Sequence, residues 1–124
     1  MGNIIQGDGF TIDETKFDFF FGRVTSNPVN KIRSLQNLKE LNKLGINDTI
    51  EGKQLLMQIF QSGLNGQKIN EITKPHGLTV VRKIEISNNE IRGAIEISYF
   101  YPHSDLTLIP KITTIIPKIY QEKT

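Results

Sequence analysis

Two histidines are the side chains of this sequence best suited to proton transfer near neutral pH. His76 lies between Pro75 and Gly77, and His103 lies in the segment Pro102-His103-Ser104-Asp105. Both segments are rich in turn-forming residues, so we expect both histidines in loops at the ends of strands. Loop histidines on a surface are often inert, and that alternative stays open. As a working hypothesis we give His76 a catalytic role and His103 a role in substrate binding.

Arg82 is the candidate cation, because it interrupts an apolar series. The residues at alternate positions around it are apolar, namely Leu78, Val80, Ile84 and Ile86. An unpaired buried charge costs several kcal/mol, so Arg82 needs an explanation. Either its side chain extends to the rim of the core or pairs with an acid from a helix, or it lies in a cleft and contacts a phosphate. The second interpretation makes Arg82 a catalytic residue, six positions after His76.

Three further side chains complete the candidate site. Thr114 lies in the segment Lys-Ile-Thr-Thr-Ile-Ile-Pro, where packing in a strand explains a threonine, but its hydroxyl is also suited to bind a phosphate oxygen as a catalytic group. Arg33 and Lys83 are candidate substrate-binding cations, with a solvated surface as the alternative. No carboxylates show convincing metal-ligand spacing, so we expect neither a metal nor a cofactor, although ligands can converge through folding.

Two helices are predicted in the first half of the chain. Asn27 and Pro28 form a typical helix start, apolar residues recur at helical spacing from Val29 to Leu44, and Gly45 is a typical stop. Asp48, with Glu51 three residues later, predicts the start of a second helix that ends at Gly63. The polar segment 65–77 is predicted to be a loop.

The second half of the chain shows the period of two that is typical of strands. We predict a hairpin of Leu78–Ser87 and Glu90–Tyr101 around the turn Asn88-Asn89, in which Ser87 pairs with Glu90. This register places the apolar residues and Arg82 on one face and the polar residues on the other. A third strand is predicted over Leu106–Ile119, with Pro110 and Pro117 placing it at an edge or creating a bulge.

Length and composition predict one soluble α+β domain over residues 1–124. Of the 124 residues, 37% are hydrophobic and 23% are charged, which excludes a disordered chain. The predicted fold has N-terminal helices packed on a twisted C-terminal antiparallel β-sheet of three to four strands. A fourth strand is placed either within 67–73 or near the N-terminus.

Further classes are excluded by residues that the sequence lacks. The absence of cysteine excludes disulfides and thiolate metal sites. We expect no membrane insertion, because no apolar run reaches about 18 residues. The N-terminus has no signal-peptide pattern, so export would need another segment or system. The net charge of +2 permits a polyanionic partner and argues mildly against an acidic one.

Two long segments resemble the C-terminal toxin domains of bacterial polymorphic toxins, in particular the LXG-type toxins. They are FGRVTSNPVNKIRSLQNLKELNKLGI and IEISYFYPHSDLTLIPKITTIIPKI, and the most specific pieces are FGRVTSNP, IRSLQN and TTIIP. Such domains are similar in layout to ribonucleases of the barnase/EndoU/colicin/RelE group. The resemblance implies a nuclease that is secreted and delivered into the cytoplasm of a target cell, where it acts on RNA or DNA. It also implies a cognate immunity protein as partner.

Three hypotheses follow. The first is a metal-independent ribonuclease toxin in which His76 transfers the proton while Arg82 and Arg33 stabilise the charged phosphorane. The second is a DNase toxin that depends on a divalent metal. The third is a non-catalytic immunity or interaction module, against which the positive net charge counts modestly, because partners of basic toxins are usually acidic.

Overall fold

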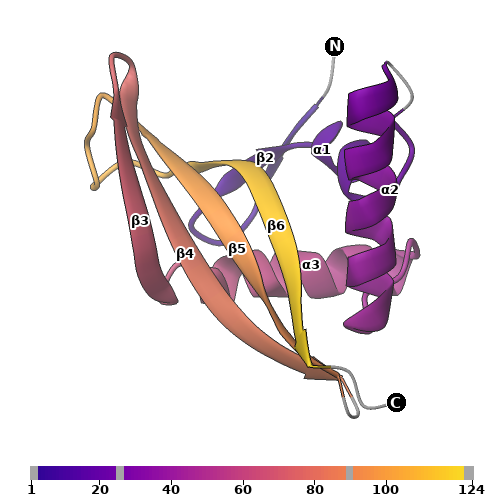
Figure 1. The fold of residues 1–124 in the computed structure, drawn as a ribbon. Coiled ribbons are helices and arrows are strands. Elements are labelled where there is room, and N and C mark those ends of the chain that lie inside the picture. Colours follow the sequence, from indigo (N-terminus) through magenta and orange to yellow (C-terminus); the bar gives the residue numbers. More distant parts are fainter. Residues whose placement is uncertain (1–2, 25–26, 89–90, 122–124) are drawn as a thin grey trace.

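The computed structural model describes residues 3–24, 27–88 and 91–121 (Figure 1). In this part of the chain two short strands come first, three helices follow, and four strands end the fold. In chain order the elements are β1 (Ile4–Gln6), β2 (Thr11–Asp13), α1 (Lys16–Phe20), α2 (Pro28–Lys43), α3 (Ile50–Gly63), β3 (Gln67–Lys74), β4 (Gly77–Asn88), β5 (Ile91–Pro102) and β6 (Lys111–Gln121).

The six strands form one mixed sheet in the order β1-β2-β6-β5-β4-β3. All neighbours are antiparallel except β2 and β6, which pair in parallel at Thr11–Lys111 and Ile12–Ile112. The expected antiparallel sheet of three to four strands behind N-terminal helices is therefore wrong, although the α+β class holds. A strand near the N-terminus was left open as an alternative, but β1 and β2 could not be located, because three residues are too few to show an alternating pattern.

The polar segment 65–77 was expected to be a loop, and this is wrong for most of its length. Residues Gln67–Lys74 form the edge strand β3, and all eight of its residues are exposed. A strand without a buried face carries no apolar alternation, which explains why the pattern pointed to a loop. The proposed fourth strand within 67–73 is present, and strands near the N-terminus are present too.

Helix α2 begins where its capping residues predicted. The Asn27 side chain accepts a hydrogen bond from the Asn30 N–H at 2.8 Å, and Gly45 has a φ of +85° just after the helix. The predicted Asp48 cap of α3 is wrong. Thr49 caps the helix through a 3.0 Å bond from the Gly52 N–H, while Asp48 is bound to Arg23.

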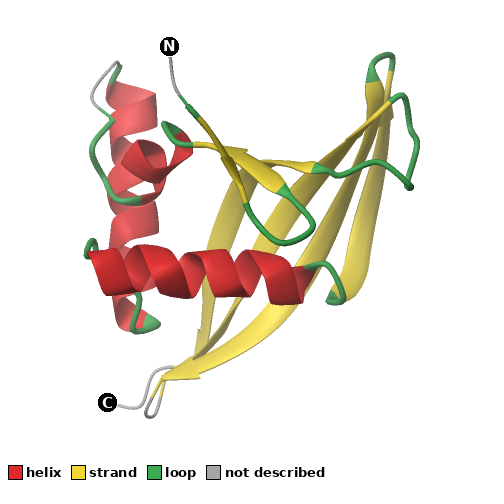
Figure 2. Ribbon diagram, turned by 180° about the vertical axis from the view of Figure 1, so that it is seen from behind, coloured by secondary structure: helices red, strands yellow, loops and turns green. Residues whose placement is uncertain are grey.

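The helices cover one face and one edge of the sheet. Helix α3 lies across the face seen in Figure 2, beside the β1–β2 hairpin, whereas α2 stands next to β6. The core lies between α3 and this face, where Leu56 and Phe60 pack with Ile95, Ile97 and Tyr99. Within the described chain no helix covers the opposite face of the central strands, which we call the open face.

The β4–β5 hairpin has the predicted faces but not the predicted register. Ser87 pairs with Arg92 instead of Glu90, a slip of two residues. An even slip leaves every side chain on its predicted face, so the hydrophobic pattern cannot detect it. It does change the cross-strand neighbours: Lys83 now pairs with Glu96. The predicted turn residue Asn89, like Glu90, lies outside the described residues.

Strand β6 starts at Lys111, five residues later than expected. Its first two residues pair with β2 and the rest pair only with β5, so most of β6 is a sheet edge. An edge tolerates Pro117, which has no N–H to donate, as the sequence predicted. None of the helices in the described ranges is long and apolar enough to cross a membrane.

Candidate functional site

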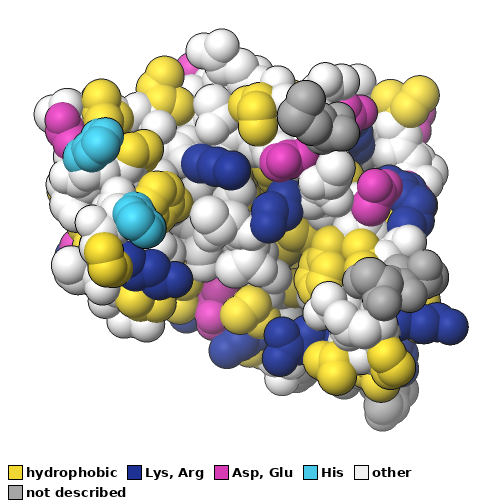
Figure 3. All heavy atoms as spheres, turned by 90° about the horizontal axis from the view of Figure 1, so that it is seen from above, with side chains coloured by type: hydrophobic (Ala, Val, Ile, Leu, Met, Phe, Trp, Pro, Cys, Tyr) yellow, Lys and Arg dark blue, Asp and Glu magenta, His cyan; other side chains and the backbone are white. Residues whose placement is uncertain are grey.

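The two histidines lie next to each other at one end of the sheet. His76 is in the β3–β4 turn, and its carbonyl accepts a hydrogen bond from the His103 N–H at 3.0 Å. Both side chains are exposed, and the histidines, cyan in Figure 3, gather at one end of the molecule. The structure therefore brings His76 and His103 together, as neighbouring turns rather than as a closed site.

Arg82 lies away from the histidines and points toward the helix side of the sheet. Its guanidinium Nη1 donates a 2.9 Å hydrogen bond to the carbonyl of Gly66, just after α3, and its buried Nε has no partner. At about 3.3 Å per residue, the six residues from His76 to Arg82 span about 20 Å of strand. The guanidinium is thus neither in bulk water nor near an imidazole. Its visible contact ties the end of α3 to β4.

The open face carries a cluster of opposite charges across three strands. Glu96 of β5 lies between Lys83 of β4, its direct cross-strand neighbour, and Lys118 of β6. Glu96 Oε2 lies 3.0 Å from Lys118 Nζ, and the Glu96 side chain is only 15% exposed. Lys83 is also half-buried, with its Nζ 3.7 Å from Glu85. We call Lys83, Glu96 and Lys118 the carboxylate–lysine cluster.

The charges of this cluster support each other. The hydrogen bond and the negative charge of Glu96 raise the pKa of Lys118 above its ordinary value. Lys118 is accordingly a firm cation at neutral pH. Because Glu96 is largely withdrawn from water, its interaction with Lys118 is screened less than that of a fully exposed pair.

A bulge in β6 adds hydroxyl groups beside the cluster. Ser98 pairs with Thr114 and Tyr99 with Ile112, so Thr113 is an extra residue in β6. Ile112 and Ile115 are both buried, and the extra residue lets Thr113 and Thr114 lie together between them, on the side of Ser98. Thr113 donates a 3.4 Å hydrogen bond to the Ser98 carbonyl. Bulges occur often next to active sites, where they redirect side chains.

Arg33 and Thr114 line one groove between α2 and β6. The groove has a volume of ≈770 Å³, and its walls include Ile32, Lys118 and Tyr120. On the α2 wall Ile32 is 67% exposed, because the apolar residues in the first half of α2 do not reach the core. The structure therefore brings Arg33 and Thr114 into the same groove as Lys118. Lys83 lies beside this groove, with its Nζ 5.8 Å from the ring centre of Tyr120.

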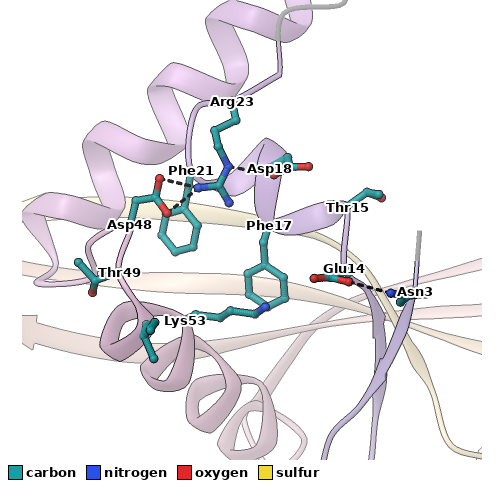
Figure 4. Close-up of a pocket in the computed structure, with 11 residues that line it drawn as sticks. Asn3, Glu14, Thr15, Phe17, Asp18, Phe21, Arg23, Asp48, Thr49 and Lys53 are labelled. Atoms are coloured by element: carbon teal, nitrogen blue, oxygen red, sulfur yellow. Dashed lines mark hydrogen bonds and ion pairs between the residues drawn. The ribbon is translucent and has the colours of Figure 1, made fainter. Parts of the chain in front are cut away.

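Another cavity, of ≈610 Å³, lies where the N-terminal segment meets α1 and the start of α3 (Figure 4). Arg23 joins its walls: Nη1 lies 2.6 Å from both carboxylate oxygens of Asp48, and Nε lies 2.9 Å from Asp18. These bonds, with Asp48 first, raise the pKa of Arg23. Lys53 Nζ lies 4.9 Å from the ring centre of Phe17. Because Arg23 ties Asp18 of α1 to Asp48 just before α3, we interpret this cluster as a structural clamp.

The carboxylate–lysine cluster is suited to phosphoryl chemistry. An ionised carboxylate can remove a proton from an attacking hydroxyl, and ammonium groups stabilise the negative charge of a pentavalent phosphorus. Both kinds of group lie within one small area of an uncovered sheet face. Among the described residues no group of three or more His, Asp or Glu side chains is placed to bind a metal ion.

Sequence reasoning missed Glu96 and Lys118. Glu96 was placed on the polar face, but the predicted register paired it with Val81, so it had no cation as a direct neighbour. The signal was available: with the hairpin moved by two residues, Lys83 and Glu96 become an opposite-charge pair. The contribution of Lys118 depends on how β6 pairs with β5, which the bulges obscure.

Comparison with known proteins supports the fold. No family model matches the chain, and no curated protein matches it. A solved structure does match, described as a contact-dependent growth inhibition toxin–immunity protein complex from Klebsiella pneumoniae 342. It superposes with a TM-score of 0.70 at 24% sequence identity, over 86% of this chain and 98% of that chain. The two chains share a fold across nearly their whole length.

Proposed function

We propose that this domain is the nuclease domain of an interbacterial toxin and that it cleaves RNA on the open face of its sheet without a metal. The observation that carries the proposal is the half-buried Glu96 carboxylate held beside Lys118 and Lys83. Withdrawing a carboxylate from water costs free energy, and charged groups in such surroundings gather at functional sites.

In this mechanism Glu96 removes the proton from the ribose 2′-hydroxyl, whose oxygen attacks the adjacent phosphorus. Lys118 stabilises the negative charge that develops on the phosphate oxygens. Lys83, on the other side of Glu96, donates a proton to the departing 5′-oxygen. The products are a 2′,3′-cyclic phosphate and a free 5′-hydroxyl. Thr114 and Arg33 contact the phosphates on either side along the β6–α2 groove.

The biological setting is proposed from the shared fold. The matching structure is described as a complex of a growth inhibition toxin with its immunity protein. We therefore propose a role in interbacterial competition, with delivery into the cytoplasm of a target cell and inhibition by a cognate immunity protein. The finer assignment to LXG-type toxins rests on the sequence resemblance alone.

The purified domain tests the proposal when it is incubated with total RNA and with plasmid DNA, each with and without EDTA. We expect cleavage of RNA in both conditions, with 2′,3′-cyclic phosphate ends, and no cleavage of DNA. Cleavage of DNA that EDTA abolishes would instead establish the metal-dependent DNase.

The description of the matching structure names both an immunity protein and a toxin, which favours one second candidate function. If this domain were an immunity protein, it would cut neither nucleic acid and would bind and inhibit a toxin. Expression of the domain alone separates the two roles, because a toxin arrests growth of the host cell whereas an immunity protein leaves growth unchanged.

A further inference from the structure

Tyr120 is a large aromatic residue that the fold places on the surface beside the proposed centre. Its side chain is 52% exposed, although it belongs to a sheet strand. Gly93 pairs with Ile119 and Arg92 with Gln121, so Tyr120 is the extra residue of a second bulge in β6. Ile119 packs against the core, and the bulge frees Tyr120 from the ladder. The two bulges of β6, at Thr113 and Tyr120, thus flank Lys118.

The ring of Tyr120 separates two hollows. One is the groove toward α2, which also contains Arg33 and Thr114. The other is a cavity of ≈430 Å³ lined by Glu85, Ser87, Arg92 and Tyr120 among others. Lys83 Nζ lies 5.8 Å from the ring centre, so one cation of the carboxylate–lysine cluster already contacts the ring. A group stacked on Tyr120 would therefore lie beside Lys83, and Lys118 lines the same groove as Tyr120.

We propose that Tyr120 is a stacking platform for one nucleobase of single-stranded RNA. This inference rests on the proposed function and names its substrate class. A base must leave its helical stack to lie on the ring, so the site selects unpaired RNA over a duplex. The base then fixes the neighbouring phosphate beside Lys118 and Glu96, with Arg92 available to contact the next phosphate. Tyr120 is therefore a binding residue, and the carboxylate–lysine cluster remains the reacting centre.

The test uses a short single-stranded 2′-O-methyl oligonucleotide, which cannot be cleaved through the 2′-hydroxyl. Its dissociation constant is measured for the wild type, for Tyr120→Phe and for Tyr120→Leu, with circular dichroism to confirm folding. Phenylalanine keeps the π-face, whereas leucine keeps an apolar side chain without one. We expect wild-type binding for Tyr120→Phe and about tenfold weaker binding for Tyr120→Leu, the size of one stacking contact.

An oligonucleotide with abasic sites along its length isolates the stacking. The wild type and Tyr120→Leu should bind it with equal affinity, because no base is left to stack. Equal loss on the abasic oligonucleotide would mean that Tyr120→Leu damages phosphate binding, and this would overturn the inference. No binding of the intact oligonucleotide by the wild type, or no effect of Tyr120→Leu, would overturn it as well.

A second measurement needs no variant and guards against a folding defect. In the wild-type complex, nuclear magnetic resonance should show ring-current shifts of the base protons and nuclear Overhauser effects between these protons and the Tyr120 ring. The absence of both signals would overturn the inference. Failure of the proposed function is distinguishable, because these experiments measure binding only. Stacking without RNA cleavage would sustain the subsite and reject the ribonuclease. RNA cleavage without stacking would do the reverse.

Discussion

Lys118 and Glu96 form the contact on which the proposed chemistry depends. The hydrogen bond to Glu96, together with the negative charge of Glu96, raises the pKa of Lys118 above its ordinary value of 10.5. A lysine with a raised pKa in the folded state contributes stability below its unfolded pKa, and this contribution is lost as pH rises through the raised value. The Lys118 side of the pair is thus charged at neutral pH, and the pair is lost in alkaline solution as Lys118 loses its proton.

Glu96→Gln removes the charge that holds Lys118, so it should lower the pKa of Lys118 back toward 10.5. The change is measured by nuclear magnetic resonance titration of the lysine side chains labelled with ¹³C at Cε. Lys111, on the same strand, serves as the internal control and should not shift. An unchanged Lys118 titration would show that the contact does not exist in solution.

Arg82 and Lys83 are neighbours in β4 that point to opposite faces, and they make a matched pair. Arg82→Met removes the bond to the Gly66 carbonyl and should cost about 1.5–3 kcal/mol of unfolding free energy, because the lost bond involves a charged donor. We expect the kcat/KM for RNA cleavage to stay near that of the wild type.

Lys83→Met should do the opposite, lowering kcat/KM at least tenfold while changing the unfolding free energy by about 1 kcal/mol or less, the size of a partly exposed ion pair. Urea denaturation and initial cleavage rates measure the two quantities for both variants. If Arg82→Met abolished cleavage without loss of stability, Arg82 would be the catalytic cation, as the sequence first suggested.

At the scale of elements, α3 is fixed to the sheet by one buried polar contact. The Tyr99 hydroxyl donates a 2.6 Å hydrogen bond to the Phe60 carbonyl, and burial raises the pKa of Tyr99. Gly63 of α3 packs against the same tyrosine, since a Cβ there would overlap it. The helix thereby packs against β5, the strand that carries Glu96 on its opposite face.

Tyr99→Phe leaves the Phe60 carbonyl buried without its partner. We expect it to lower the unfolding free energy by about 1–3 kcal/mol, the penalty for an unsatisfied buried acceptor. Chemical denaturation of the two proteins measures the difference. Tyr101→Phe is the control from the same strand, and it should cost less, since no side-chain hydrogen bond of Tyr101 accompanies its burial among the described contacts. Equal stability of Tyr99→Phe and the wild type would contradict this account.

The sequence predicted those elements that carry their own local signals. Asn27 and Pro28 marked the start of α2, and alternation in β4 and β5 assigned the faces of the hairpin correctly. The short strands β1 and β2 and the fully exposed β3 carry no such pattern, so they were missed or left open. The predicted register of the β4–β5 hairpin was wrong by two residues, and for this reason the Lys83–Glu96 pair was not predicted.

At the scale of the whole molecule, some residues of the candidate site could be predicted from the sequence and others could not. Arg33, Lys83 and Thr114 were selected by residue type, and the structure gathers them around β6. His76 and His103 were selected in the same way, but they lie together at another end of the sheet. Glu96 and Lys118 could be recognised as site residues only from the pairing of β4, β5 and β6, which no local sequence pattern encodes.

The shape of the molecule suits the proposed role. One face of the sheet is covered by α3 and supplies the core (Figure 1). No helix of the described chain covers the other face, which carries Lys83, Glu96 and Lys118. A toxin built in this way exposes its reacting groups to the unpaired segments of a large RNA. An immunity protein could inhibit it by covering the same face.

The most direct test is the rate at which the purified domain cleaves one defined RNA, measured for the wild type, Glu96→Gln and His76→Ala, with folding checked by circular dichroism. Loss of a general base typically costs about 10²–10⁴-fold. We predict a loss of this size for Glu96→Gln and a rate close to that of the wild type for His76→Ala. A folded Glu96→Gln protein that cleaves as fast as the wild type would contradict a reacting centre on the open face.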